Sequence, residues 1–259
     1  MALLILAFTL LGLCTGSFLN VCIDRLPRGQ SIISPPSHCS ACNHKLGIRD
    51  LVPLFSYLWL RGRCRYCRAP IPLRLPIVEG MTGLLFAFLY WKFGLGLELG
   101  ISLVYACWLT VIFVIDLENQ LVLDKVVYPG MALALAFSFF SPGLGGVIAL
   151  PVEALSRVVS SVAGGALGLG ALALPFIIYR RGMGLGDVKL GALVGLMTGY
   201  PLVLVALLLS VISGGLVGAI LLTFKIKKRK DPIPFAPFLA TSAMVTLLWG
   251  QAICQWYLP

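Results

Sequence analysis

Residues 108–130 read "WLTVIFVIDLENQLVLDKVVYPG", and this stretch decides the fold. An apolar run ends at Asp116, a short polar stretch follows, and a second apolar run begins near residue 126. Apolar runs approaching about 20 residues and broken by short charged loops are typical of helices that cross a membrane. The stretch therefore predicts two membrane helices joined by a loop at one face of the bilayer.

The composition of the whole chain indicates the same class of protein. Hydrophobic residues make up 59% of the 259 residues and charged residues only 12%, whereas soluble domains carry about 25% charged residues. The net charge of +10 therefore does not indicate a nucleic-acid partner, because basic residues in membrane proteins mainly mark the loops that face the cytoplasm.

The same apolar pattern recurs along the chain and predicts an all-α polytopic membrane protein with about eight transmembrane helices. The segments are 2–23, 75–92, 97–116, 126–141, 156–179, 187–200, 202–224 and 234–257. The sixth is short for a span of roughly 20 residues, and the sequence leaves open whether it crosses the membrane or re-enters it.

The basic residues set the orientation of these helices. The first, Arg25, follows the first apolar run, which predicts an uncleaved first helix with its amino end outside rather than a secretory signal peptide. In that orientation 18 of the 20 basic residues fall in segments facing the cytoplasm, as the positive-inside rule requires. These segments are 24–74, 117–125, 180–189 and 225–233. We therefore expect a multi-pass membrane protein in contact with membrane lipid.

Two CxxC pairs lie in the polar insertion 24–74, which is too small to build a large core of its own. Twenty-one residues separate the pairs, and two such pairs place four thiolates around one Zn²⁺ ion. The predicted ligands are Cys39, Cys42, Cys64 and Cys67. Four protein ligands leave no open position, so we expect this zinc to be structural.

Two aspartates are predicted at the same face of the membrane. Asp116 ends the third apolar segment, and Asp187, in "GMGLGDVKL" (182–190), begins the sixth. Two aspartates that share a site hold one proton between them, so one accepts a proton from water while the other donates one to a carbonyl oxygen. Gly182, Gly184 and Gly186 allow a sharp turn and a close approach by a neighbouring chain. A simpler interpretation of Asp187 is that it caps a helix as its N-cap residue.

Six of the other eight acidic residues fall into two groups. Asp24, Asp50, Glu118, Asp124 and Asp231 are expected to be ordinary interfacial or solvated charges. Glu79, in "PIVEGMTG", lies inside the second apolar segment, where a carboxylate indicates a buried partner or a polar site.

At these motifs the chain resembles the bacterial prepilin peptidases, also called type IV leader peptidases, nearly from end to end. "GSFLNVCIDRLP" (16–27) resembles the amino-terminal signature of that family, and the cysteine pairs match its zinc-bearing domain. "PIVEGMTG", "DLENQLVLD" and "GMGLGDVKL" match three further motifs. One departure is Leu123, where the family's first aspartate motif usually has proline before Asp124.

The resemblance implies two activities on prepilins and related pseudopilins. Aspartic-protease chemistry by Asp116 and Asp187 would cleave the basic leader at the cytoplasmic face of the bacterial inner membrane. The new amino terminus would then be methylated with S-adenosylmethionine as the methyl donor. Glu79 and Gly83 match the segment associated with methylation and are the expected cofactor-binding residues. The implied domains are a first helix (1–23), a zinc-binding cytoplasmic domain (24–74) and a peptidase core (75–259).

Three alternatives remain at this point. No glycine-rich nucleotide fingerprint marks a pocket for S-adenosylmethionine, so the chain could be a peptidase without methylation. It could be an intramembrane protease of the GxGD type, although the cysteine insertion argues against that. A transporter or scaffold with buried acids as ion ligands is the remaining alternative from another class.

Overall fold

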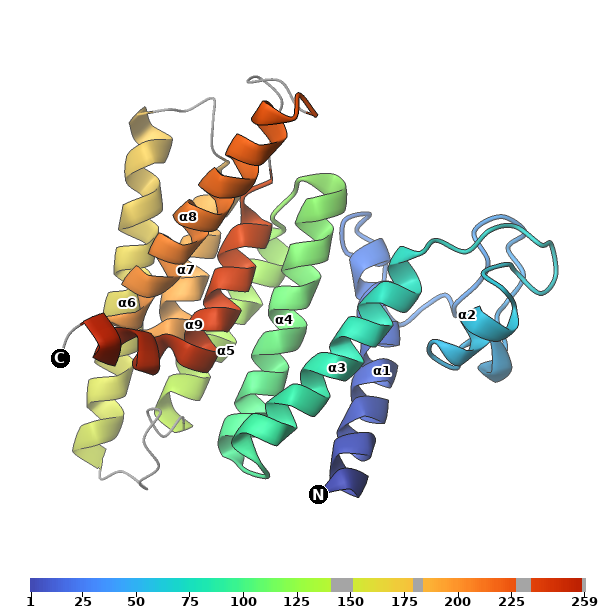
Figure 1. The fold of residues 1–259 in the computed structure, drawn as a ribbon, viewed down its shortest axis with the longest axis horizontal. Coiled ribbons are helices and arrows are strands. Elements are labelled where there is room, and N and C mark those ends of the chain that lie inside the picture. Colours follow the sequence, from blue (N-terminus) through green and yellow to red (C-terminus); the bar gives the residue numbers. More distant parts are fainter. Residues whose placement is uncertain (141–150, 179–183, 227–233, 258–259) are drawn as a thin grey trace. The chain divides into compact units, whose positions relative to one another are not determined.

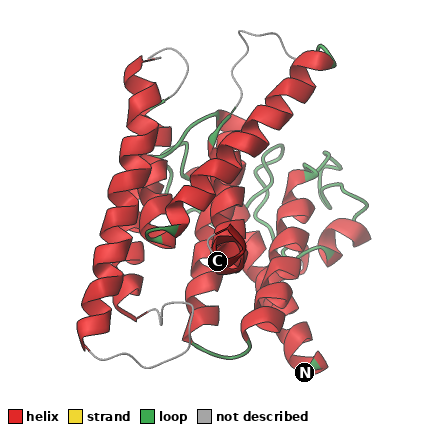
Figure 2. Ribbon diagram, turned by 60° about the vertical axis from the view of Figure 1, so that its left-hand side comes forward, coloured by secondary structure: helices red, strands yellow, loops and turns green. Residues whose placement is uncertain are grey.

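The structure is a computed structural model, and it describes residues 1–140, 151–178, 184–226 and 234–257. All regular elements within these ranges are helical (Figure 2), which confirms the predicted all-α class. The chain divides into two compact units, Met1–Val111 and Ile112–Pro259. The predicted domain boundaries at 23 and 74 remain a prediction.

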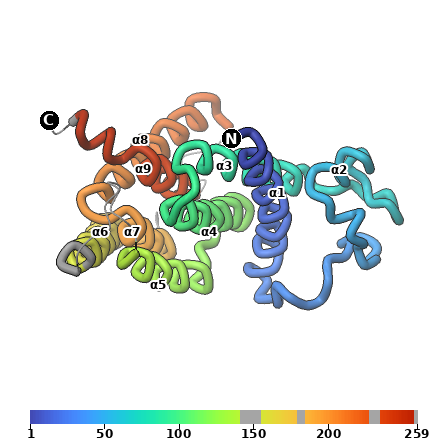
Figure 3. Tube along the Cα trace, turned by 90° about the horizontal axis from the view of Figure 1, so that it is seen from below, coloured from blue at the N-terminus to red at the C-terminus, as the bar shows by residue number. Residues whose placement is uncertain are grey.

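The first unit pairs two long helices. Helix α1 (Ala2–Arg25) lies along α3 (Arg74–Phe93), as Figures 1 and 3 show. Small residues bring the two helices together: a Cβ atom on Gly12 would lie 2.7 Å from the Thr82 carbonyl oxygen. Close backbone approach through small residues is the usual way in which helices pack in a membrane.

The insertion between α1 and α3 has little regular structure. It contains a single 3₁₀ turn, η1 (Ile48–Asp50), and the five-residue helix α2 (Phe55–Trp59). Among residues 26–73 only Cys64 is buried. The insertion therefore has no apolar core that could hold it together.

The second unit is built around α7 (Leu185–Thr198), which contacts α5 (Asp124–Phe140), α6 (Pro151–Ile178), α8 (Leu202–Thr223) and α9 (Ala236–Tyr257). Leu190, Leu193 and Val194 of α7 have no exposed surface. The boundary between the units falls within α4 (Leu97–Asn119).

Glycines allow α6 and α7 to pack closely. A Cβ atom on Gly168 of α6 would clash with the Gly191 carbonyl of α7, and one on Gly164 would lie 2.8 Å from the Gly199 Cα. The backbones of the two helices therefore touch, and this close packing helps to fix α7 in the bundle.

All eight apolar segments of the sequence form helices within the described residues, with ends near the predicted ones. Within the described residues, five helices are long and apolar enough to cross a membrane: α1, α4, α6, α8 and α9. The predicted count of eight spans is not confirmed. At about 1.5 Å per residue, the 14 residues of α7 cover about 21 Å, less than the roughly 30 Å thickness of the hydrocarbon core.

Candidate active site and metal centre

The two predicted aspartates come together in the second unit. Asp116 lies in the last turn of α4 and is only 4% exposed. Asp187 lies in the first turn of α7 and is half-buried. Their carboxylates are close enough for the charges to interact. The structure therefore places two acids that are 71 positions apart in the sequence within range of an electrostatic interaction.

Backbone N–H groups hold each carboxylate in place. The N–H of Ala236, the first residue of α9, donates a hydrogen bond to the Asp116 carboxylate. The Asp187 Oδ2 atom accepts the N–H of Gly184 at 3.4 Å. The Asp116 Oδ2 atom is buried and has no hydrogen-bond partner among the described residues. One oxygen of the pair is thus left to meet another molecule.

The interpretation of Asp187 as the N-cap residue of its helix is wrong. Gly184 is the N-cap residue of α7, and Asp187 is the third helical residue, whose side chain accepts the Gly184 N–H. The chain enters the helix three residues earlier than expected because Gly184 adopts the extended cap conformation. A negative charge in this first turn is still favoured by the helix dipole.

Gly186 allows the two aspartate segments to approach. A Cβ atom on Gly186 would lie 2.7 Å from the Val122 Cβ, so any larger residue would push the loop after α4 away from α7. Gly184 meets no such neighbour, and Gly182 lies outside the described residues.

An ion pair joins the same two segments. The Lys189 ammonium, two residues after Asp187, lies 2.7 and 2.9 Å from the Asp124 carboxylate oxygens and 5.3 Å from the centre of the Tyr128 ring. Sequence reasoning missed this pair, having taken Asp124 as an ordinary interfacial charge. Opposite charges in the two aspartate motifs were the available signal. Leu123 in place of proline does not prevent α5 from beginning at Asp124.

The four cysteines gather at the other candidate site, in the insertion of the first unit. Their Sγ atoms all lie within 4.8 Å of one another, and the Sγ atoms of Cys39 and Cys67 are 3.8 Å apart. Four sulfurs bound tetrahedrally at the usual zinc–sulfur distance of about 2.3 Å would be about 3.8 Å apart. The donor set therefore fits a zinc ion. All the cysteines of the chain are free thiols.

The two CxxC pairs form matching turns. The Asn43 N–H donates to the Cys39 carbonyl at 2.8 Å, and the Arg68 N–H donates to the Cys64 carbonyl at 3.1 Å. Both donor residues have left-handed φ angles, 56° and 62°. Each turn places its two sulfurs on one side, so the pairs face each other as two halves of one site.

The pKa shifts of two of the four thiols also favour binding of a cation at this site. The backbone N–H groups of Cys42 and Ala41 lower the pKa of Cys39 to about 6. The Ala69 N–H acts in the same direction on Cys67, but desolvation and the other three cysteines outweigh it and raise the Cys67 pKa to about 11. Four thiolates at one point repel each other, and a divalent ion removes that repulsion.

Other side chains tie the cysteine site together. The His44 ring lies 3.6 Å from the Tyr66 ring, centre to centre, and so links the two turns. Arg65 forms an ion pair with Asp50 at 2.7 Å. The His38 ring contacts the Pro36 carbonyl. Within the described residues the candidate metal-binding group contains only the four cysteines, and neither histidine is part of it.

The two residues expected at a cofactor site lie on α3. Glu79 is 8% exposed, and its Oε2 atom accepts the Leu54 N–H at 2.8 Å. Gly83 faces α1, where a Cβ atom would lie 2.9 Å from the Leu13 Cδ2. The buried partner expected for Glu79 is therefore the backbone of the insertion, and Gly83 serves helix packing.

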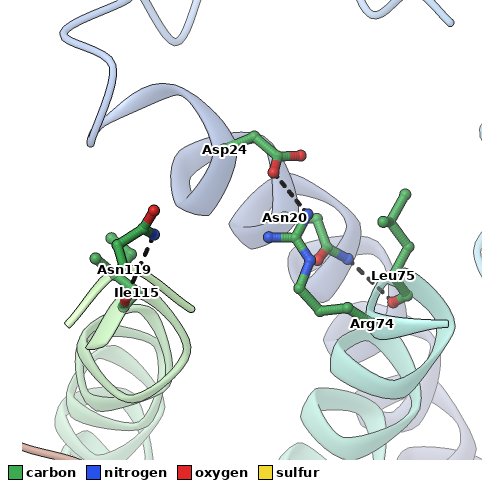
Figure 4. Close-up of polar contacts among 6 residues, drawn as sticks. All are labelled: Asn20, Asp24, Arg74, Leu75, Ile115 and Asn119. Carbon is green, nitrogen blue, oxygen red and sulfur yellow. Dashed lines mark hydrogen bonds and ion pairs between the residues drawn. The ribbon is translucent and has the colours of Figure 1, made fainter. Parts of the chain in front are cut away.

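Polar contacts surround the end of α1 next to the insertion (Figure 4). The Asn20 side chain donates to the Leu75 carbonyl at 3.1 Å, and Arg74 forms an ion pair with Asp24 at 2.7 Å. The Asn20 Oδ1 atom is buried without a partner. In the second unit, the Asn119 side chain shown in Figure 4 donates to the Ile115 carbonyl one turn earlier in α4.

Comparison with known proteins gives a consistent result along the whole chain. Residues 10–93 match the bacterial peptidase A24 N-terminal domain, and residues 103–219 match the type IV leader peptidase family. A prepilin leader peptidase/N-methyltransferase of Stutzerimonas stutzeri is 33% identical over 98% of this chain and 93% of its own length. Proteins with the same name from Aeromonas hydrophila and Bacillus subtilis are 34% and 33% identical, over 96% and 95% of this chain and 92% and 95% of their own lengths.

No solved structure matches this chain. The family models and the relatives both cover the cysteine insertion and the two aspartates. A match of this extent, at about one residue in three, establishes common descent, and the chain belongs to the type IV leader peptidase family.

Proposed function

We propose that this protein is a bifunctional membrane enzyme acting on prepilins and related pseudopilins. It cleaves the leader peptide by aspartic-protease chemistry and then methylates the new amino terminus. The observation that carries the proposal is the meeting of Asp116 and Asp187 in a chain similar throughout to prepilin leader peptidase/N-methyltransferases.

The carboxylate pair supplies the cleavage step. One aspartate is ionised and accepts a proton from a water molecule as that water attacks the peptide carbonyl carbon. The other is protonated and donates to the carbonyl oxygen, which forms a tetrahedral intermediate. The intermediate collapses when the departing amine takes a proton from the pair, the C–N bond breaks and the leader leaves as a carboxylic acid. The unpartnered Asp116 Oδ2 is available for these transfers.

The active site opens at the cytoplasmic face of the membrane in this proposal. The excess of basic residues in the segments next to Asp116 and Asp187 favours that side. A prepilin carries a basic leader followed by an apolar helix, so the helix can remain in the bilayer while the junction reaches the aspartates. Open backbone is tolerated at that depth only where protein or water satisfies its hydrogen bonds.

Methylation is assigned to the first unit. Glu79 and Gly83 are the proposed cofactor-binding residues, Gly83 acting through the packing of α1 on α3. The unpartnered Asn20 Oδ1 atom and the second oxygen of Glu79 are acceptors that fit the amino groups of S-adenosylmethionine. When bound, this cofactor supplies an electrophilic methyl group for the free amine.

The four cysteines would hold zinc as a structural ion. Their sulfurs fill all four tetrahedral positions, so this ion has no site left for substrate. Its proposed role is to give the insertion the fold that its few buried side chains do not provide.

Incubation of the purified protein with a prepilin, with and without S-adenosylmethionine, tests both activities by mass spectrometry of the product. Asp116→Asn and Asp187→Asn should each abolish cleavage, and Asp24→Asn, an exposed acid in the first unit, should not. Normal cleavage by either active-site variant would refute the carboxylate pair. A cleaved product that never gains a methyl group would indicate a peptidase only, and a cut within the apolar helix would indicate an intramembrane protease.

A further inference from the structure

The insertion carries a large exposed apolar surface that neither proposed activity uses. Ile48 of η1 is 89% exposed, and Phe55, Leu58 and Trp59 of α2 are 61%, 72% and 73% exposed. We call these four residues the α2 surface. Large apolar side chains gathered on the outside of a folded module usually mark an interaction site.

Contacts within the insertion keep the side chains of the α2 surface exposed to the outside. The rings of Phe55 and Trp59, one helical turn apart, stack at 5.8 Å between centres. Tyr57 is half-buried and lies against Gly62, where a Cβ atom would be 2.8 Å from its hydroxyl oxygen. Helix α2 therefore turns one side toward the insertion and presents the stacked rings outward.

Positive charge borders the α2 surface. Between residues 45 and 68 the insertion contains six basic side chains and one acidic side chain. The single acid, Asp50, is already paired with Arg65. Arg49 and Arg61, which flank the apolar residues in sequence, are exposed. The region therefore joins exposed aromatic and aliphatic groups to unneutralised positive charge.

Exposed aromatic groups next to positive charge favour a membrane surface over a basic prepilin leader as the binding partner of the α2 surface. Aromatic side chains next to Arg and Lys favour the headgroup layer of a membrane, where rings enter the acyl boundary and cations meet anionic phosphates. The insertion is joined at both ends to helices of the first unit, one of which, α1, is long and apolar enough to cross a membrane. A basic prepilin leader, the substrate of the proposed function, would be repelled by the same charges.

We propose that the α2 surface rests in the anionic headgroup layer of the membrane that holds the protein. Ile48, Phe55, Leu58 and Trp59 enter the interface, and Arg49 and Arg61 bind lipid phosphates. The zinc-binding insertion is then a module lying on the membrane surface and not one suspended in the cytoplasm.

Fluorescence of Trp59 in the full-length protein tests this. The protein is placed in nanodiscs of phosphatidylethanolamine and phosphatidylglycerol, with or without bromine on the acyl chains near the glycerol. The signal of Trp59 is the difference between wild type and Trp59→Phe. Brominated lipid should remove roughly half of that signal, and aqueous acrylamide should remove little. Trp256, 78% exposed on the candidate span α9, provides the positive control through Trp256→Phe.

Three results would overturn the proposal. Quenching of Trp59 by acrylamide but not by brominated lipid would place the α2 surface in water. Protection from both quenchers would mean that protein covers it. Protection of Trp59 from quenching that appears only after a prepilin is added would mean that the α2 surface binds substrate. None of these readings depends on cleavage or methylation, so a failure of the proposed enzyme activity is measured separately.

The charge contribution is tested in the same nanodiscs with Arg49→Gln and Arg61→Gln combined. Quenching of Trp59 by brominated lipid should fall in the double variant, and replacing phosphatidylglycerol by phosphatidylcholine should lower it in the wild type. Quenching that is insensitive to both changes would overturn the binding of anionic headgroups. Full zinc content in the variants verifies that the insertion is still folded.

Discussion

The insertion 26–73 and helix α7 hold their functional side chains by opposite means. Helix α7 contacts four other helices, and within 188–198 only Lys189 and Leu196 are not fully buried. The insertion buries a single residue, Cys64, and depends on short polar contacts. Tight packing surrounds Asp187 without any ligand, whereas we expect the cysteine turns to need a cation to become rigid. The same kind of mutation should therefore have different consequences in the two regions.

Apart from changes to the aspartates themselves, the largest effect is expected from a side chain added where α6 meets α7. In Gly168→Ala the new Cβ would clash with the Gly191 carbonyl, and backbone cannot move aside as a flexible side chain can. A shift of about 1 Å in a catalytic group can cost about 100-fold in rate, and we expect a loss of that order in leader cleavage. Zinc content should not change.

Gly170→Ala is the matched control for this variant. It lies two residues further along α6, and a Cβ atom there meets nothing within 4 Å. Its cleavage rate should equal that of the wild type. A Gly168→Ala enzyme with the wild-type rate would show that the packing of α7 does not position Asp187.

The next effect concerns the metal. Cys64→Ser removes the one buried ligand, and metal analysis should fall from about one zinc ion per chain to a small fraction of that. Limited proteolysis should then cut residues 26–73 faster, because folding of this region is coupled to metal binding. Cleavage of the leader should fall by less than in Gly168→Ala. Cys14→Ser, a change on α1 far in sequence from the two CxxC turns, is the control, and its zinc content should stay normal. Loss of zinc in Cys14→Ser as well would indicate general unfolding.

A smaller effect is expected from the ion pair next to the aspartates. In Lys189→Met the link to Asp124 is lost, while α7 stays packed on its buried side. Both partners are partly exposed, and exposed pairs contribute little, so cleavage should fall only about fivefold. Lys125→Met, an exposed neighbour on α5, should have no effect.

A double-mutant cycle separates positioning from a general change of charge. Asp124→Asn combined with Lys189→Met should be no slower than the worse single variant if the two side chains act only through each other. Additive losses would mean that each has its own role, and the pair would not be a link between the aspartate segments.

Much of this arrangement was predictable from the sequence, for reasons that differ between the regions. Apolar runs of helical length fix each membrane helix by burial alone, so the predicted segments fall close to the observed ones. The spacing of the cysteines restricts their chemistry almost completely, and the four sulfurs do gather. Asp116 and Asp187 were expected at one face, and their charges do interact.

The contacts between distant segments were not predictable. The meeting of Lys189 with Asp124, or of Ala236 with Asp116, depends on how helices pack, which a single sequence records only indirectly. The role of Glu79 shows the same limit. Its burial was expected from its place in an apolar run, but nothing in the sequence pointed to the Leu54 N–H as its partner.

Glu79 offers the smallest and most informative change. The residue that it holds, Leu54, has a left-handed φ of 58°, so the hydrogen bond stabilises a turn that leucine does not favour. A hydrogen bond to a charged acceptor is worth about 1.5–3 kcal/mol. In Glu79→Ala, exchange of the Leu54 amide hydrogen should become at least about tenfold faster, with leader cleavage unchanged. Slow exchange in this variant would contradict a positioning role.

Glu79→Gln separates positioning from binding of the methyl donor. The amide oxygen of glutamine still accepts the Leu54 N–H, so the turn and its slow exchange should be kept. A carboxylate that also bound the cofactor would lose its charge in this variant, and methyl transfer would then fall while Leu54 stayed protected. Unchanged methyl transfer in Glu79→Gln, together with a loss in Glu79→Ala, would mean that Glu79 serves methylation only by holding the insertion on α3.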